Sequence, residues 1–256
     1  MKTVSILISN YNSYEALQLC IESIKKYTRF PHKIIVYDDC STNKVDLEYL
    51  RDKADKAWIN LIEGDSRLNH GGALTQLLNN CNTDLAMILD NDIQILGSGW
   101  LEEMVSLVQD NILAVWTIEY NYKSYELSFP DWIQTWFFML NMQIYRDGME
   151  IDWNRAYEDK NKEPFKSLMR DDERLGRSDL IALPPGTKLL LKIKYDNPKG
   201  YKIISPTPKY IKDKYVHYAH VSSIATEDLS DSEKFKKARR EKMDRIKYDL
   251  MQLRGQ

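Results

Sequence analysis

Strand-like and helix-like segments alternate through the first part of the chain, and this alternation constrains the fold more than any other feature. Residues 4–8, 33–37 and 85–89 are short, mostly apolar runs of the kind that forms buried strands. Apolar residues recur at helical spacing over residues 16–27 and again from Leu74. Strands that alternate with helices predict a mostly parallel central α/β sheet, flanked by helices and joined by right-handed crossovers.

Each of the three apolar runs stops at a cluster of polar residues. The clusters are residues 9–12, 38–42 and 90–92, and the last contains two carboxylates spaced one residue apart. Ligands of open α/β sheets bind at the carboxyl ends of the strands, so three such clusters on one edge predict a binding site. Any one cluster taken alone also fits a turn or a helix cap, and Asn12 with Glu15 resembles a capping box.

The segment Asn69-His70-Gly71-Gly72 runs directly into the helix predicted around Leu74. Glycines at the start of a helix let backbone N–H groups and the positive end of the helix dipole approach an anion. We therefore expect a phosphate-binding segment here, and the His70 side chain is a further candidate for a phosphate contact.

Four motifs occur in order over the same region: Val-Ser-Ile-Leu-Ile-Ser-Asn-Tyr-Asn, Val-Tyr-Asp-Asp-Cys-Ser-Thr, Asn-His-Gly-Gly and Leu-Asp-Asn-Asp. The ordered set resembles the inverting GT-A fold glycosyltransferases of the large family-2 type, and it is far more specific than any single motif. The resemblance implies a Rossmann-like GT-A fold. It also implies transfer of a sugar from a nucleotide-sugar donor, a UDP-sugar by default, to an unidentified acceptor hydroxyl with inversion.

The same resemblance assigns roles to residues of the polar clusters. It implies that Ser9 and Tyr11 lie near the nucleoside, and that Asp38 contacts the base. Asp90 then lies on the ribose side, and Asp92 binds a divalent metal. The full set of donor-binding residues that it implies is Ser9, Asn10, Tyr11, Asp38, Asp39, Ser41, Asn69, Gly71, Gly72, Asp90 and Asn91.

A metal at Asp92 also agrees with the chemistry of such a reaction. Breaking a sugar–diphosphate bond leaves a highly charged diphosphate, and Mn²⁺ or Mg²⁺ bound to its oxygens neutralises that charge. These ions prefer hard oxygen ligands such as carboxylates. The alternative is that Asp90 or Asp92 caps a helix over residues 101–108, but Gly97-Ser98-Gly99 lies nearer to that helix and can begin it.

A second metal ligand is expected in residues 215–223, which hold two of the four histidines of the chain. This segment is similar to the histidine-containing segment that follows the last core strand in many GT-A enzymes. The resemblance favours His220 as the ligand and His217 as the second choice, and neutral imidazole suits Mn²⁺. The alternative for either histidine is a structural role.

An inverting transfer needs a carboxylate that removes the proton of the acceptor hydroxyl. Many relatives carry a Glu-Asp or Asp-x-Gly element before their next helix, but this chain has Leu-Pro-Pro-Gly-Thr at residues 183–187. Asp179 is therefore the first candidate for the base, followed by Asp171 and Asp172, and each also fits a solvated surface carboxylate. The charge-dense residues 146–178 are expected to form a lid or an acceptor loop.

The chain divides into three predicted parts. Residues 1–112 form the donor-binding half, and residues 113–225, which are rich in aromatic side chains, form the acceptor-binding half of the same domain. Residues 226–256 form a basic helical tail with a narrow apolar stripe. We expect that stripe to pack on its own domain or to join a homo-oligomer, while peripheral contact with a membrane is the weaker alternative.

Composition excludes several other classes of protein. The 256 residues carry a formal net charge of −2, which argues against nucleic acid as a partner. Three cysteines, without the spacing of a zinc site, favour a reducing cytoplasmic location. No stretch is long and apolar enough for a membrane helix.

Two other functions compete with glycosyl transfer. A sugar-phosphate nucleotidyltransferase normally opens with a glycine-rich basic loop after its first strand, and residues 9–12 do not resemble one. A catalytically silent nucleotide-sugar-binding or scaffold module remains the stronger alternative, because the expected element for the base is replaced.

Overall fold

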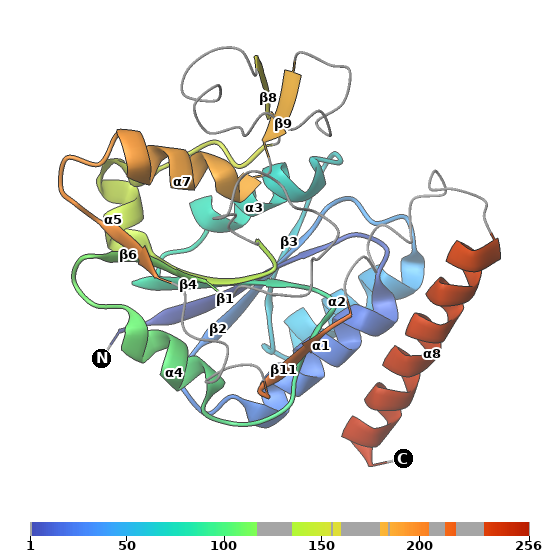
Figure 1. The fold of residues 1–256 in the computed structure, drawn as a ribbon. Helices are drawn as coiled ribbons and strands as arrows, with labels where there is room; N and C mark the ends of the chain where they lie inside the picture. Colours follow the sequence, from blue (N-terminus) through green and yellow to red (C-terminus); the bar gives the residue numbers. More distant parts are fainter. Residues whose placement is uncertain are drawn as a thin grey trace.

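A computed structural model gives the fold and describes residues 2–116, 135–154, 156–159, 180–183, 185–204, 213–218 and 233–255. These residues form a central sheet of seven strands in the order β10-β6-β7-β4-β1-β2-β3 (Figure 1). Its strands are β1 (Val4–Asn10), β2 (Lys33–Asp38), β3 (Asn60–Glu63), β4 (Leu85–Asp90), β6 (Ile112–Trp116), β7 (Phe137–Asn141) and β10 (Lys202–Ile204).

The sheet is parallel except at β7. Parallel pairing joins β4, β1, β2 and β3, and it also joins β6 to β10. The strand β7 lies between β4 and β6 and runs antiparallel to both. The mostly parallel α/β sheet predicted from the alternating pattern is confirmed. The strand-like residues 137–140 belong to β7, which lies inside the sheet between β6 and β4.

Helices cover both faces of the sheet (Figure 1). They are α1 (Tyr14–Tyr27), α2 (Lys44–Asp55), α3 (Asn69–Asn79), α4 (Trp100–Leu107), α5 (Met142–Ile144), the π-helix η1 (Tyr145–Met149), α7 (Pro185–Tyr195) and α8 (Glu233–Arg254). Because side chains alternate along a strand, Ile6 and Ile8 pack with α1, α2 and α4, while Leu7 packs with α3. The sheet is therefore buried on both faces, as its continuous apolar strands require.

Two short ribbons lie outside the main sheet. The strand β5 (Ile93–Ile95) pairs antiparallel with β11 (Tyr215–His217), and β8 (Ala156–Asp159) pairs antiparallel with β9 (Leu180–Leu183). In the first ribbon His217 lies opposite Ile93. This pairing joins a segment late in the chain to the polar cluster that follows β4.

The predicted C-terminal helix is α8, and its apolar stripe packs on α1. Ile246 and Leu250 are buried against Ala16 and Leu19, with Met243 and Leu253 packed at the border of the cluster. Two contacts at the end of the helix add to this packing, an ion pair between Arg254 and Glu22 and a hydrogen bond from Lys26 Nζ to the Leu253 carbonyl. The stripe is thus used within the chain. None of the helices in the described ranges is long and apolar enough to cross a membrane.

Candidate functional site

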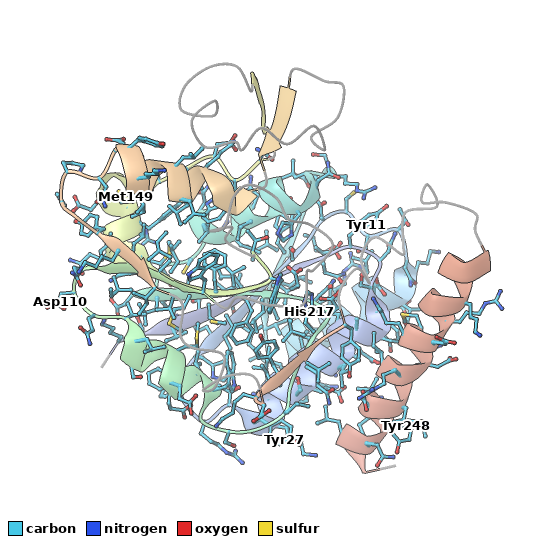
Figure 2. The ribbon with its side chains drawn as sticks, viewed as in Figure 1. Tyr11, Tyr27, Asp110, Met149, His217 and Tyr248 are labelled. Atoms are coloured by element: carbon cyan, nitrogen blue, oxygen red, sulfur yellow. The ribbon has the colours of Figure 1, made fainter. Side chains whose placement is uncertain are left out.

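The three predicted polar clusters meet at the carboxyl edge of the sheet because their strands end in register. Ser9 lies beside Asp90 across the β1–β4 pair, and Asn10 lies beside Asp38 across the β1–β2 pair. The Asn10 side chain bridges all three strand ends. Its Nδ2 donates to Asp38 Oδ1 at 2.9 Å, and its Oδ1 accepts from Asn91 Nδ2 at 3.1 Å. Figure 2 shows Tyr11 and His217 in this part of the molecule, away from Asp110.

Asp38 is buried within a hydrogen-bond network of its own loop. Its carboxylate accepts bonds from the Ser41 backbone N–H at 2.8 Å and from Ser41 Oγ at 2.7 Å, in addition to Asn10. Only 1% of Asp38 is exposed. These hydrogen bonds show that Asp38 and Ser41 stabilise the loop after β2. Their predicted contacts with a nucleotide-sugar donor stay predictions.

Asp39 and Asn12 hold neighbouring loops. The Asp39 carboxylate accepts hydrogen bonds from the backbone N–H groups of Leu68 and Asn69, at 2.6 and 2.8 Å, just before α3. Burial raises the pKa of Asp39, while those two N–H groups and the nearby Arg67 oppose the shift. Asn12 Oδ1 accepts bonds from the backbone of the loop that precedes α2.

The capping box expected from Asn12 and Glu15 is wrong. The residue that precedes α1 is Ser13, and its side chain makes no capping hydrogen bond. Asn12 instead has a left-handed backbone, with φ at 46°, and its side chain is directed to the next loop. Asparagine adopts this conformation more readily than most residues, which is a physical reason for its presence there.

A cavity of about 300 Å³ opens above this network. It is lined by Ser9, Asn10, Tyr11, Asp39, Arg67, Asn69, His70, Ala73, Asp90 and Asn91. On one wall the Arg67 guanidinium lies over the Tyr11 ring, 3.9 Å from its centroid. Most of the predicted donor-binding residues therefore border one cavity, and Arg67 is a lining residue that the sequence pattern did not identify.

The two glycines of the predicted phosphate-binding segment are buried and pack closely against the protein itself. A Cβ atom on Gly71 would lie 2.2 Å from the Trp153 carbonyl oxygen, and one on Gly72 would lie 2.6 Å from Leu68 Cβ. Close approach of α3 to the segment around Trp153 thus explains Gly71, and the close contact with Leu68 explains Gly72. Neither lines the cavity, so their predicted donor contact remains a prediction.

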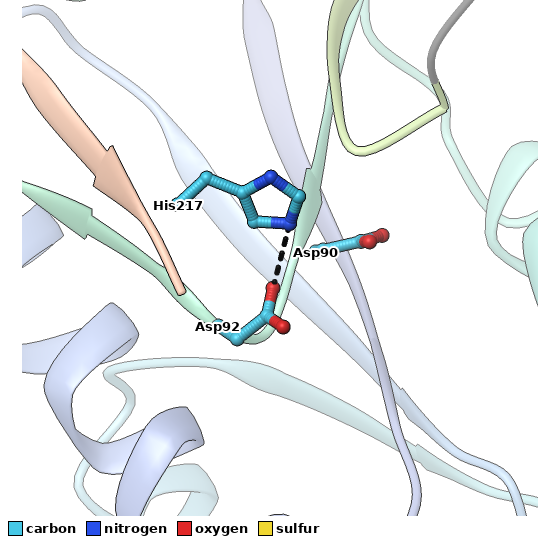
Figure 3. Close-up of side chains that lie close together, drawn as sticks. All are labelled: Asp90, Asp92 and His217. Carbon is cyan, nitrogen blue, oxygen red and sulfur yellow. Dashed lines mark ion pairs between the residues drawn. The ribbon is translucent and has the colours of Figure 1, made fainter. Parts of the chain in front are cut away.

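Beside the cavity, Asp90, Asp92 and His217 form a cluster whose potential ligand atoms all lie within 4.8 Å of one another (Figure 3). Asp90 ends β4, Asp92 lies in the turn between β4 and β5, and His217 comes from β11. His217 Nε2 lies 3.3 Å from Asp92 Oδ1, and only 3% of the Asp92 side chain is exposed. Because Asp90 also lines the cavity, the cluster and the cavity form one continuous site.

Trp136 positions two members of this cluster. Its indole stacks on the His217 imidazole, with ring centroids 4.5 Å apart and an angle of 22° between the planes. Its carbonyl oxygen accepts a hydrogen bond from the Asp90 backbone N–H at 2.9 Å. The aromatic run around Trp136 was the only sequence signal for this role, and it could equally have indicated ordinary core packing.

The metal-ligand atoms that the cluster offers fit a divalent metal. Two carboxylates and one imidazole nitrogen that share a small space suit Mn²⁺, and the carboxylates also suit Mg²⁺. Neither Asp90 nor Asp92 caps α4, which begins after Gly99 with φ at 85°. The resemblance implied that Asp90 lies on the ribose side and that Asp92 binds the metal, and in the structure both carboxylates belong to the same cluster.

Several predicted residues lie outside the described part of the chain. They are the three candidates for the base, Asp171, Asp172 and Asp179, and the favoured second metal ligand, His220. Of the two histidines considered for the metal, the one within the described ranges is His217, and it is a member of the cluster.

The comparisons with known proteins agree with this fold. Residues 5–162, more than half of the chain, match a family described as Glycosyl transferase family 2. A comparison with curated proteins finds no match.

Two solved structures are similar to this chain. The mannosyltransferase PcManGT from Pyrobaculum calidifontis, in complex with GDP-Man and Mn²⁺, has a TM-score of 0.53 and 16% identity, and the match covers 80% of this chain. TarS 1-349 from S. aureus has a TM-score of 0.52 and 14% identity over 98% of this chain, and it is also known in complex with UDP-GlcNAc. The matches span 55% of PcManGT and 71% of TarS 1-349. At these identities the likeness shows the fold alone.

Proposed function

The chain belongs to glycosyl transferase family 2, and from that premise we propose that it transfers a sugar from a nucleotide-sugar donor to an acceptor hydroxyl with inversion. The observation that carries this proposal is the continuous site in which a polar cavity adjoins the Asp90, Asp92 and His217 cluster. A nucleoside diphosphate needs a cavity for its nucleoside and a cation for its phosphates, and this site combines a cavity with candidate ligands for a cation.

The cavity supports the binding of a nucleotide through several side chains. The Tyr11 ring, with Arg67 over it, offers a flat surface beside the polar groups of Asn10 and Asn69. A flat aromatic surface stacks favourably with a planar base or a sugar ring, and the Arg67 guanidinium can also pair with a phosphate. A UDP-sugar remains the default donor, while a GDP-sugar is the alternative that the complex of PcManGT with GDP-Man suggests.

We assign the divalent metal, Mn²⁺ or Mg²⁺, to Asp90, Asp92 and His217. When bound there, it would neutralise the charge that develops on the diphosphate as the sugar departs. The protein's own part is to hold the three ligand atoms together before the donor arrives. It does so through the β5–β11 pairing and through the stacking of Trp136 on His217.

Inversion requires the acceptor hydroxyl to attack the anomeric carbon on the face opposite the departing diphosphate. The hydroxyl proton passes to a carboxylate, and the electron pair of the broken bond stays on the nucleoside diphosphate. Asp179 is our first candidate for this base, with Asp171 and Asp172 after it. Exchange of Asp179 for Asn should leave donor binding intact and abolish transfer.

The most direct test compares the melting temperature of the protein with UDP or GDP, with and without Mn²⁺ or Mg²⁺. We expect stabilisation only when nucleotide and metal are both present, and we expect Asp92→Asn to abolish it. Asp55→Asn, the same charge change at the exposed end of α2, is the control and should behave as the natural protein. Nucleotide binding that is equally strong without metal would contradict the metal assignment.

Two further arms complete this experiment. His217→Gln and His220→Gln compare the two candidate histidines, and we expect the larger loss for His217 because it is a member of the described cluster. Hydrolysis of a panel of nucleotide sugars with Mn²⁺ then names the donor. Binding of a nucleotide sugar without any hydrolysis or transfer would instead support the catalytically silent module.

For location, we keep the inference of a reducing cytoplasmic compartment. Cys20, Cys40 and Cys81 are all free thiols, and two of them are buried. Free thiols persist best where disulfides do not form.

A further inference from the structure

The helix α8 is attached directly to the Asp90, Asp92 and His217 cluster through Tyr218, the residue that follows His217. The Tyr218 backbone N–H donates to the Asp92 carbonyl oxygen at 3.0 Å. Its hydroxyl group contacts Gln94 Oε1 at 2.7 Å and the carboxylate of Asp249 on α8. The Tyr218 ring also packs with Ile246 and Leu250 of α8. The position of α8 is therefore coupled to the strand ends that carry the cluster.

Lys242 lies on the face of α8 that is turned toward the protein. It precedes the buried Ile246 by four residues, which places both side chains on the same side of the helix. Lys242 is half-buried, whereas its neighbours Arg240, Glu241 and Asp244 are exposed. Lysine side chains are seldom buried in proteins, and most cations of α8 are exposed, so the inward position of Lys242 calls for a function.

Lys242 lies one helical turn from Ile246, which packs with Tyr218 beside the cluster. Burial lowers the pKa of Lys242, and the charge that opposes this shift is the carboxylate of Asp92. Asp92 itself is buried and lies beside a second carboxylate, Asp90. Because Tyr218 joins α8 to Asp92, Lys242 lies on the part of α8 that is close to the cluster.

We propose that Lys242 is a donor-binding residue, whose ammonium group contacts the diphosphate of the nucleotide beside Asp92, so that α8 completes the donor site. This inference rests on the proposed function. Two carboxylates neutralise most of the charge of a divalent metal, so little positive charge is left to attract a diphosphate. A lysine beside the metal site supplies one more positive charge. The ammonium group also has three donors that can follow a mobile phosphate.

Lys242 takes no part in the bond changes of the transfer that we propose. The bond between the anomeric carbon and the diphosphate oxygen breaks, and the new bond forms to the acceptor oxygen. The electron pair of the broken bond stays on the diphosphate, while the acceptor proton passes to the base. Lys242 holds the leaving group through charge and hydrogen bonds alone, so it exchanges neither a proton nor an electron pair.

The test measures the dissociation constants of UDP and UMP, or of GDP and GMP if the guanine nucleotides bind better, by calorimetry with Mn²⁺ present. We expect Lys242→Met to weaken diphosphate binding about tenfold or more, as the loss of a charge-assisted contact does, and to weaken monophosphate binding much less. Lys242→Arg should restore most of the diphosphate affinity. Lys237→Met, at an exposed lysine of the same helix, is the matched control.

A second variant separates the loss of the Lys242 charge from a disturbance of α8. Asp249→Asn removes the charged partner of Tyr218 but leaves Lys242 in place, and it should lower diphosphate affinity less than Lys242→Met does. Melting temperatures without nucleotide show whether each variant is folded. The proposal is overturned if folded Lys242→Met binds diphosphate as well as the Lys237→Met control, or if it loses monophosphate affinity equally. Failure of the natural protein to bind any nucleoside diphosphate would instead refute the proposed function.

Discussion

At the scale of single residues, Asp46 is a buried carboxylate of α2 whose charge is poorly compensated. None of its surface is exposed, and neither carboxylate oxygen has a hydrogen-bond partner among the described residues. Burial and then the charges of Asp38 and Glu15 raise its pKa to about 6. The Ser13 backbone and the Asn10 side chain oppose this shift without reaching hydrogen-bond geometry.

We predict that Asp46→Asn stabilises the protein at alkaline pH. The carboxyl group contributes most to stability when it is protonated, below its unfolded pKa of 3.8, and this contribution is lost as the pH rises through about 6. Since relaxation around the charge reduces the effect, we expect a gain of about 1–2 kcal/mol at pH 8.

Urea denaturation at a series of pH values measures this gain. It should shrink steadily as the pH falls below about 6. Glu48→Gln, an exposed site on the same helix, serves as the control and should change stability by less than about 0.5 kcal/mol. A gain that is equal at pH 4.5 and pH 8 would show that the Asp46 charge is not its source.

At the scale of elements, the approach of α3 to the segment around Trp153 explains Gly71. We predict that Gly71→Ala destabilises the protein by about 1–3 kcal/mol, because the new methyl group would overlap the Trp153 carbonyl oxygen. Gly97→Ala is the matched control, since a Cβ atom there meets nothing within 4 Å. Thermal and urea denaturation compare the two variants, and equal stability would contradict the close packing.

The pairing of β5 with β11 shows a second effect at this scale. The histidine of the cluster lies far along the chain from the two carboxylates, beyond the residues that match the family, and the pairing of β5 with β11 brings it beside them. The resemblance favoured His220, which lies outside the described residues, and no local pattern showed that His217 would lie opposite Ile93. Strand register decides that, and it depends on long-range packing.

At the scale of the whole molecule, α8 packs on α1 and on Tyr218, so we expect it to fold as one unit with the sheet. We predict that Ile246→Ala lowers the free energy of unfolding by about 2–4 kcal/mol, because Ile246 is completely buried against α1 and Tyr218. Met251→Ala, at a residue of the same helix that is 49% exposed, should change it by less than about 0.5 kcal/mol.

Denaturation followed by fluorescence and by circular dichroism tests this prediction. A single transition that shifts as a whole in Ile246→Ala would show that α8 unfolds together with the sheet. A separate early transition for the helix would instead support the division of the chain at residue 226 into a tail with its own stability.

The sequence by itself determined the class of the fold and the edge of the sheet at which the site lies. Both follow from local patterns, since apolar periodicity distinguishes strands from helices and polar residues mark the strand ends. For this reason the clusters containing Asn10, Asp38 and Asp90 were predicted to share one edge, and their pairing in register confirms it.

Only the tertiary structure decided which side chains face one another at that edge. It placed β7 antiparallel inside the sheet, turned Gly71 toward Trp153, and stacked Trp136 on His217 beside Asp92. These contacts join residues that are far apart in the chain, and their energies depend on burial and register. No local pattern carries that information, because it exists only once the sheet and its helices have packed.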